Sequence, residues 1–224
     1  MQETIRILMT DDHPMIIEGY QNTLLATKKD SQDLKIDIAN SCDESIKFMN
    51  RAVSIENPYD ILFMDISLPP STDGKYTSGE DLAIYARKIM PNAKIVILTM
   101  FNESYRIHNI VKTIDPEGFL IKSDLTSKEL ASAFQAVINN PPFYSGTINS
   151  MIRKTISNDI VVDEVNRKIL HLLSQGIKTK NLIEHINLSM SAIEKRKKHL
   201  KELFFVEDGN DETLLNEARN KGFV

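Results

Sequence analysis

Residues 61–65 read Ile-Leu-Phe-Met-Asp, four consecutive apolar residues followed by a carboxylate. Residues 95–99, Ile-Val-Ile-Leu-Thr, have the same character and also end on a polar side chain. Apolar runs without alternating polar residues are typical of parallel strands that helices cover on both faces. The two runs therefore predict the centre of a buried parallel sheet with polar groups at one of its edges.

Three further apolar runs, at residues 5–9, 35–39 and 118–121, complete a set of five candidate strands. The segments between the runs have apolar residues at helical spacing, such as Leu82, Tyr85, Ala86 and Ile89. Strand and helix thus alternate over residues 1–140. This alternation predicts a doubly wound α/β domain with a five-stranded parallel sheet.

A second pattern begins after Asn140-Pro141-Pro142, which ends the last amphipathic helix of this series. Residues 150–162 are mixed in character and are interpreted as a linker. From residue 163 onward the pattern predicts only helices, over residues 167–174, 180–186, 189–204 and 212–220. We therefore expect a first domain over residues 1–147, a linker over 148–160 and a second, smaller all-α domain over 161–224.

Charge is divided unevenly between these regions. The 224 residues carry a formal net charge of −4, which argues weakly against a protein that coats nucleic acid. Residues 1–152 hold 14 basic and 20 acidic residues, a net charge of −6, whereas residues 153–224 hold 13 and 11, a net charge of +2. One cysteine is too few for an internal disulfide, and no stretch approaches the length of a membrane span, about 18 apolar residues. We expect a cytoplasmic protein without a membrane partner.

Polar side chains follow four of the predicted strands: Asp11 and Asp12, Asp65, Thr99, and Lys122. Each alone has an ordinary explanation, as a helix cap or a strand residue. Together at one edge of a sheet, the carboxylates would repel one another unless a cation lies among them, and oxygen ligands suit Mg²⁺. A carboxylate beside Mg²⁺ can accept a phosphoryl group while an ammonium and a hydroxyl stabilise the charge on its oxygens. The sequence thus predicts a phosphoacceptor, Asp65, with Thr99 and Lys122 as its catalytic partners.

Residues 4 to about 147 resemble the receiver domain of two-component response regulators, which has a flavodoxin-like fold. The strings that carry the resemblance are Met-Thr-Asp-Asp-His-Pro at 9–14, Phe-Met-Asp-Ile-Ser-Leu-Pro at 63–69, Ile-Leu-Thr-Met at 97–100 and Gly-Phe-Leu-Ile-Lys at 118–122. The resemblance implies that Asp65 accepts the phosphoryl group and that Lys122 binds the phosphate. It also implies that Asp11, Asp12, Asp65 and the carbonyl of Ser67 bind Mg²⁺, and that Thr99 and Phe119 form a coupled switch. A static core role for Phe119 stays open.

One departure from the family is an insertion, Pro-Ser-Thr-Asp-Gly-Lys-Tyr-Thr-Ser at residues 70–78, between Pro69 and Gly79. The insertion follows the predicted phosphoacceptor closely in sequence. It either tunes the choice of kinase or the lifetime of the phosphate, or it is a tolerated surface insertion.

The predicted helix at 189–204 is basic on one side. Ser189 or Ser191 can cap it, apolar residues form one stripe, and its basic residues are Lys195, Arg196, Lys197, Lys198 and Lys201. The short helix before it gives the layout of a helix-turn-helix. Residues 163–224 resemble the LuxR-type DNA-binding domain through residues 169–173, 176–180, 188–189 and 193. The resemblance implies base contacts by Glu194, Lys195 and Lys198, and phosphate contacts by Thr179, Lys180, Arg196, Lys197 and Lys201.

The expected function is that of a NarL/LuxR-type response regulator, which is not an enzyme in the usual sense. A sensor histidine kinase would transfer a phosphoryl group to Asp65, and a homodimer of the phosphorylated protein would bind promoter DNA and regulate transcription. Glu194 stands where the family often has lysine, and Arg196 where it usually has histidine. A receiver protein whose degenerate helix-turn-helix binds protein therefore stays open. An aspartyl-phosphate phosphatase is disfavoured, because Ser67 replaces the second carboxylate of such sites.

Overall fold

The computed structural model describes residues 3–100, 104–156, 160–206 and 210–224. The chain forms two compact units, which we call the sheet unit and the helical unit. The sheet unit consists of residues 1–102 and 110–148, and the helical unit of residues 103–109 and 149–224. None of the helices in the described ranges combines the length and apolar character that a membrane crossing requires.

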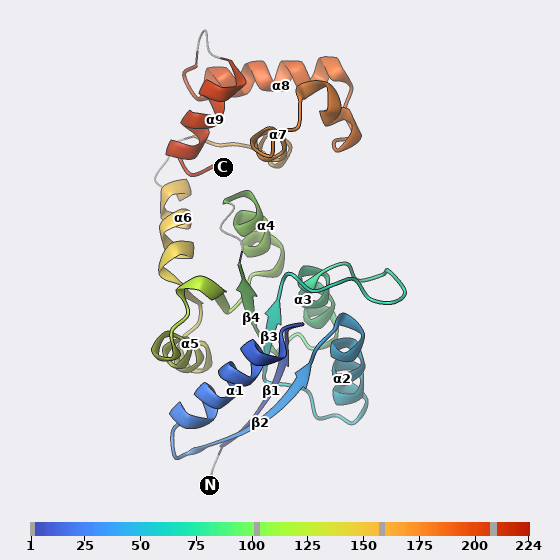
Figure 1. The fold of residues 1–224 in the computed structure, drawn as a ribbon, viewed down its shortest axis with the longest axis vertical. Helices are drawn as coiled ribbons and strands as arrows, with labels where there is room; N and C mark the ends of the chain where they lie inside the picture. The colour runs from blue at the N-terminus through green and yellow to red at the C-terminus, as the bar shows by residue number, and fades with distance from the viewer. Residues whose placement is uncertain (1–2, 101–103, 157–159, 207–209) are drawn as a thin grey trace. The chain divides into compact units, whose positions relative to one another are not determined.

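The sheet is parallel throughout and has the strand order β2-β1-β3-β4-β5-β6. Strands β1 to β4 are labelled in Figure 1. Its strands are β1 (Glu3–Thr10), β2 (Gln32–Ala39), β3 (Ile61–Asp65), β4 (Lys94–Thr99), β5 (Gly118–Ile121) and β6 (Phe143–Tyr144). The prediction of five strands is therefore wrong by one. The sixth strand has only two residues, which pair with Gly118 and Phe119, so it has no periodic pattern to read in the sequence.

Helices separate the strands, as the alternation predicted: α1 (Pro14–Thr27), α2 (Cys42–Ser54), α3 (Gly79–Ile89), α4 (Ser104–Ile114) and α5 (Ser127–Asn139). Helix α1 packs beside α5, and α2 packs beside α3. All residues of β3 are buried, and so are Ile95 to Thr99 of β4. The two unbroken apolar runs are thus central parallel strands, as predicted.

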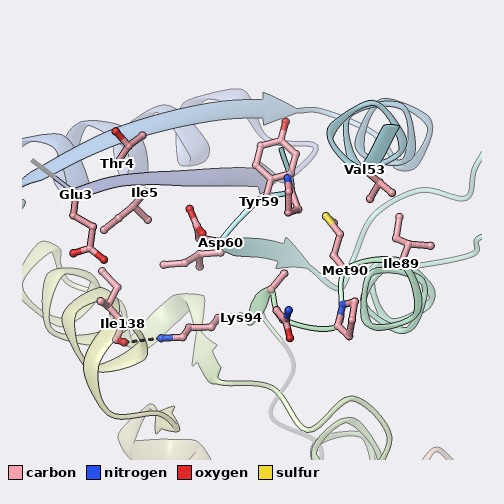
Figure 2. Close-up of a pocket in the computed structure, with 15 residues that line it drawn as sticks. Glu3, Thr4, Ile5, Val53, Tyr59, Asp60, Ile89, Met90, Lys94 and Ile138 are labelled. Carbon is pink, nitrogen blue, oxygen red and sulfur yellow. Dashed lines mark hydrogen bonds between the residues drawn. The ribbon is translucent and has the colours of Figure 1, made fainter. Parts of the chain in front are cut away.

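The strand order reverses between β1 and β3, and at such a point the carboxyl ends of the strands border a ligand crevice. The amino ends of the strands lie at the opposite edge, where a cavity of about 390 Å³ is found (Figure 2). Its lining includes Ile5, Tyr59 and Met90, and the Lys94 ammonium donates to the carbonyls of Val137 and Ile138. The acidic residues lie at the other edge, so the cavity is separate from the chemistry that the sequence predicts.

The helical unit contains α7 (Glu164–Ser174), the 3-10 helix η2 (Thr179–Glu184), α8 (Met190–Leu203) and α9 (Asp211–Asn220). Its core gathers apolar side chains from all four elements, including Ile169, Leu182, Ile193 and Leu214. Two expectations need correction. The sequence predicted no helix at Gly146–Ile156, where the structure has α6 in the first part of the stretch interpreted as a linker, and the short helix expected at 180–186 is a 3-10 helix.

Candidate functional site

Three carboxylates meet at the carboxyl edge of the sheet. Strands β1 and β3 are neighbours, with Thr10 opposite Met64, so the residues that follow, Asp11 and Asp65, lie side by side. Asp65 is fully buried and Asp11 is 1% exposed. Asp11, Asp12, His13 and Asp65 each place one ligand atom within 4.8 Å of the others. The structure therefore brings together the acidic residues that the sequence assigned to a metal.

Lys122 joins this cluster from the end of β5. Its ammonium lies 2.7 Å from Asp11 Oδ2 and 3.0 Å from Asp65 Oδ2, and its side chain is 5% exposed. Burial raises the pKa of the Asp65 carboxyl, and the contact with Lys122 offsets part of that rise. A buried ammonium between two buried carboxylates reduces their mutual repulsion and holds the two side chains together.

Several oxygens of the cluster fit a cation. Asp11 Oδ2, Asp12 Oδ1 and both oxygens of Asp65 are buried and lack a hydrogen bond within the part of the chain that the structure describes. Lys122 and His13 lie at ion-pair distance from three of these oxygens, and Asp65 Oδ1 has no such ion pair among the described residues. Buried carboxylate oxygens without a hydrogen bond need a further positive partner. A set of carboxylate oxygens suits a hard divalent cation.

His13 is the member of the cluster to which the sequence reasoning gave no role. Its Nδ1 lies 2.8 Å from Asp12 Oδ1 and 3.2 Å from Asp11 Oδ1, and its backbone N–H donates to Asp11 Oδ1 at 3.0 Å. The ring itself is 60% exposed. Its position directly after two aspartates at the end of a buried strand was the signal that could have identified it.

Thr99 and Phe119 lie on the neighbouring strands β4 and β5. Thr99 ends β4 and is 1% exposed, and it pairs with Ile121, one residue before Lys122. Phe119 pairs with Ile97 and is fully buried. Its ring meets Tyr144 edge to face, with centroids 6.4 Å apart. The structure thus places Phe119 inside the core. On β5, Phe119 comes two residues before Ile121, the residue that pairs with Thr99.

Ser67 and the insertion follow Asp65 on the β3–α3 connection. Ser67 is exposed. The inserted residues 70–78 return the chain to α3 at Gly79, whose N–H donates to the carbonyl of Ile66 at 3.1 Å. A Cβ atom at Gly79 would overlap the backbone carbonyl oxygen of Asp65. This close approach requires glycine where the chain comes back over the predicted phosphoacceptor.

The predicted DNA-reading helix is α8, and Ser189 caps it by accepting from the N–H of Ala192. Glu194, Lys195 and Lys198 are exposed, and so is Lys180 of η2. The other predicted DNA contacts have partners inside the helical unit, which are Asp163 for Arg196 and Asp211 for Thr179, Lys197 and Lys201. The structure therefore separates these residues into an exposed group and an internally paired group.

Comparison with known proteins adds relatives over nearly the whole chain, although no family model matches it. The transcriptional regulatory protein RcsB of Escherichia coli strain K12 is 24% identical over 215 residues, 95% of this chain and 93% of the relative. The oxygen regulatory protein NreC of Staphylococcus epidermidis is 22% identical over 209 residues, covering 88% and 89%. These relatives confirm the resemblance to NarL/LuxR-type response regulators.

Solved structures give the same fold. An RcsB–DNA complex aligns with a TM-score of 0.63 at 21% identity and covers 97% of this chain and 99% of RcsB. RcsB from Salmonella enterica serovar Typhimurium, bound to promoter P1flhDC with the phosphomimetic BeF₃⁻, aligns with a TM-score of 0.62 at 21% identity over the same shares. The isolated REC domain of that RcsB covers 66% of this chain, with a TM-score of 0.53. The α/β unit with a parallel sheet and the helical unit are thus both found in these structures.

Proposed function

We propose that this chain is a two-component response regulator that accepts a phosphoryl group on Asp65 and regulates transcription by binding promoter DNA. The observation that carries the proposal is the buried Asp65 carboxylate, 3.0 Å from the Lys122 ammonium and clustered with Asp11 and Asp12. The names of the relatives, both regulatory proteins, agree with this function. In this proposal residues 1–147 receive the phosphoryl group, residues 161–224 bind DNA, and residues 148–160 connect them.

The transfer itself needs one nucleophile. A carboxylate oxygen of Asp65 attacks the phosphorus of a phosphohistidine on a sensor kinase, the P–N bond breaks, and the histidine nitrogen leaves. Lys122 and Thr99 contact the phosphoryl oxygens and stabilise their charge. Mg²⁺, held by Asp11, Asp12, Asp65 and the Ser67 carbonyl, supplies further neutralisation of those oxygens when bound. The chain is a stoichiometric phosphoacceptor in this scheme and turns over no separate substrate.

The response to phosphorylation begins at Thr99. A phosphate on Asp65 offers acceptor oxygens that draw the Thr99 hydroxyl toward them, which vacates space near β5. Phe119, buried against Tyr144, is the aromatic residue that would rearrange. We propose that this change favours a homodimer that binds promoter DNA in the cytoplasm. The alternative for the helical unit, binding of protein rather than DNA, is favoured by one observation: several of its basic residues are paired internally.

Phosphorylation of the full chain by acetyl phosphate in the presence of Mg²⁺ tests the first half of the proposal. We expect phosphate-affinity electrophoresis to show a shifted band for the wild type and none for Asp65→Asn. Asp33→Asn, at the far edge of the sheet on β2, is the matched control and should shift as the wild type does. Undiminished phosphorylation of Asp65→Asn would show that Asp65 is not the phosphoacceptor.

A gel shift of the phosphorylated full chain on duplex DNA over a salt series tests the second half. Phosphate contacts release counterions, so the affinity should fall steeply as salt rises. Absence of any salt-dependent binding would instead favour the protein-binding alternative.

A further inference from the structure

Helix α8 carries five basic residues, and the structure divides them by burial and by partner. Lys195 and Lys198 are exposed, Arg196 and Lys201 are half-buried, and Lys197 is 7% exposed. A lysine or arginine side chain that contacts DNA must be exposed in the free protein. The division therefore bears on which residues of α8 reach a duplex, given the proposed DNA binding on which this inference rests.

Arg196 is held by the start of α7. Its Nη1 donates to Asp163 Oδ2 at 2.8 Å, to Asp163 Oδ1 at 3.1 Å and to Asn166 Oδ1 at 3.0 Å. Asp163 is also the N-cap of α7, where it accepts from the N–H of Asn166 at 2.8 Å. One carboxylate thus caps α7 and fixes α8 against it.

Lys197 lies on the buried stripe of α8, between Ile193 and Leu200. Its ammonium donates to Thr179 Oγ1 at 2.6 Å and to Asp211 Oδ2 at 2.9 Å. Thr179 begins η2 and Asp211 begins α9, so this one side chain ties three elements together. Moving the ammonium to a DNA phosphate would break both of these hydrogen bonds and carry the lysine out of the packed stripe between Ile193 and Leu200, although Asp211 itself is 39% exposed.

Glu194, Lys195 and Lys198 form the exposed side of the helix. Among the described residues none of the three takes part in an ion pair. Residues 194 and 198 are one turn apart and therefore lie on the same face. In a helix-turn-helix this exposed face of the second helix enters the major groove.

Given the base contacts that the resemblance implies for Glu194, Lys195 and Lys198, we propose that Glu194 selects a cytosine and that Arg196 and Lys197 are positioning residues that do not contact DNA. A carboxylate can only accept hydrogen bonds. In the major groove, cytosine presents an amino donor, guanine presents only acceptors, and adenine places an acceptor beside its amino group. Cytosine is therefore the base that Glu194 favours.

The first test uses the full phosphorylated chain and a random-sequence duplex, with affinity measured across a salt series. Each phosphate contact contributes about 0.9 to the magnitude of the slope of log affinity against log salt. We expect Lys195→Ala and Lys198→Ala each to lower that magnitude measurably, by up to about 0.9, because an exposed ammonium in the groove displaces counterions. An unchanged slope for both variants would contradict their contact with DNA. Arg196→Gln and Lys197→Met should leave the slope unchanged even if they weaken binding. Lys88→Ala, an exposed lysine of α3, is the matched control.

Should Lys197→Met fail to fold, the double variant Lys197→Met, Asp211→Leu replaces the pair with two apolar side chains and gives the same readout. A fall of about 0.9 for Arg196→Gln or for either Lys197 variant would overturn the positioning role. No salt-dependent binding by the wild type would overturn the proposed function itself, and this inference with it.

The second test selects bound sequences from a pool of random duplexes. We expect the wild type and Lys88→Ala to enrich the same site with a cytosine at one position. Glutamine pairs with adenine, so Glu194→Gln should change the preference at that position from cytosine to adenine by about fivefold or more. Identical sites for the wild type and Glu194→Gln would overturn the role of Glu194 while leaving DNA binding intact.

Discussion

The ammonium of Lys122 lies between two buried carboxylates, 2.7 Å from Asp11 and 3.0 Å from Asp65. Burial raises the pKa of the Asp65 carboxyl, and the Lys122 ammonium and a backbone hydrogen bond from Ser67 oppose that rise and favour the ionised, nucleophilic form. In the proposed function, the same ammonium contacts the oxygens of the transferred phosphoryl group. At the scale of single residues, the proposed chemistry and the local stability thus depend on one side chain.

Replacement of that side chain by Lys122→Met should lower the free energy of unfolding by about 3 kcal/mol, because two buried carboxylates lose their positive partner. Urea unfolding at neutral pH measures the change, and saturating Mg²⁺ should reverse part of it by supplying positive charge. The extent of phosphorylation by acetyl phosphate should also decrease in Lys122→Met. Lys128→Ala, an exposed lysine of α5, should behave as the wild type. A Lys122→Met protein as stable as the wild type without Mg²⁺ would contradict this account.

The carboxylates of the cluster could be predicted because they lie at the ends of the neighbouring strands β1 and β3, and parallel strands bring their carboxyl ends to one edge. Lys197 could not be predicted in the same way. A lysine within a basic run reads as solvent-exposed, and its partner Asp211 belongs to another helix. Only the packing of α9 against the rest of the unit makes this lysine part of the interior.

At the scale of elements, the insertion at 70–78 is anchored at both ends. Thr72 donates its backbone N–H and its hydroxyl to Asp43 Oδ2 of α2, at 3.0 and 2.8 Å. Tyr76 meets Tyr85 of α3 edge to face, with ring centroids 5.2 Å apart. The insertion is therefore a folded element fixed to α2 and α3, which the sequence did not indicate beyond its length.

Removal of the α2 anchor by Asp43→Ala should lower the free energy of unfolding by about 1 kcal/mol, since two exposed hydrogen bonds to a carboxylate are lost. Limited proteolysis should cut residues 70–78 faster, whereas the rate of labelling at Asp65 should stay the same. Lys47→Ala, exposed on α2, is the control. A changed labelling rate or phosphate lifetime in Asp43→Ala alone would assign the insertion a tuning role instead.

The junction of α7 and α8 gives a prediction on pH. Partial burial opposes ionisation of Asp163, but the hydrogen bond from Asn166 and the Arg196 guanidinium lower the pKa of its carboxyl below the ordinary value. The stabilisation is thus fully present above the unfolded pKa, about 3.9, and is lost as the pH falls through the lowered folded value. Thermal melts followed by circular dichroism between neutral pH and pH 3 should show a smaller acid loss for Asp163→Asn than for the wild type.

At neutral pH, Asp163→Asn should already be less stable than the wild type. Glu212→Gln removes an exposed carboxylate that has no ion pair among the described residues, and it should keep the acid dependence of the wild type. Parallel acid profiles for the wild type and Asp163→Asn would show that the α7 cap contributes nothing to the pH dependence.

Elements with a long apolar run or a clear apolar stripe could be predicted from the sequence. The four-residue apolar run of β3 and the stripe of α8 carry enough residues to fix the type of element. Strand β6 has two residues and forms only because β5 offers a free edge, with Phe143 opposite Gly118. Helix α6 was not predicted, because its stretch of the sequence is mixed in character and was interpreted as a linker.

At the scale of the whole molecule, the net charge of −4 conceals two different units. Residues 1–152 carry −6, which includes the clustered carboxylates of the site, and residues 153–224 carry +2. Part of the positive charge of the second region neutralises its own aspartates, through Arg196 and Lys197. The charge available to DNA is therefore set by which side chains are exposed, and not by the sum for either unit.

Differential scanning calorimetry with Mg²⁺ tests whether the units respond separately. A cation that binds only the folded acidic cluster stabilises it by mass action, by about 2.7 kcal/mol at a concentration of one hundred times Kd. We expect Mg²⁺ to raise the melting transition of the sheet unit and to leave that of the helical unit in place, because the carboxylates of the cluster all belong to the former. Asp12→Asn removes a ligand without disturbing the Lys122 pairs and should abolish the shift, whereas sodium chloride of equal ionic strength should not reproduce it. A shift of both transitions, or an unchanged shift in Asp12→Asn, would show that Mg²⁺ acts elsewhere on the chain.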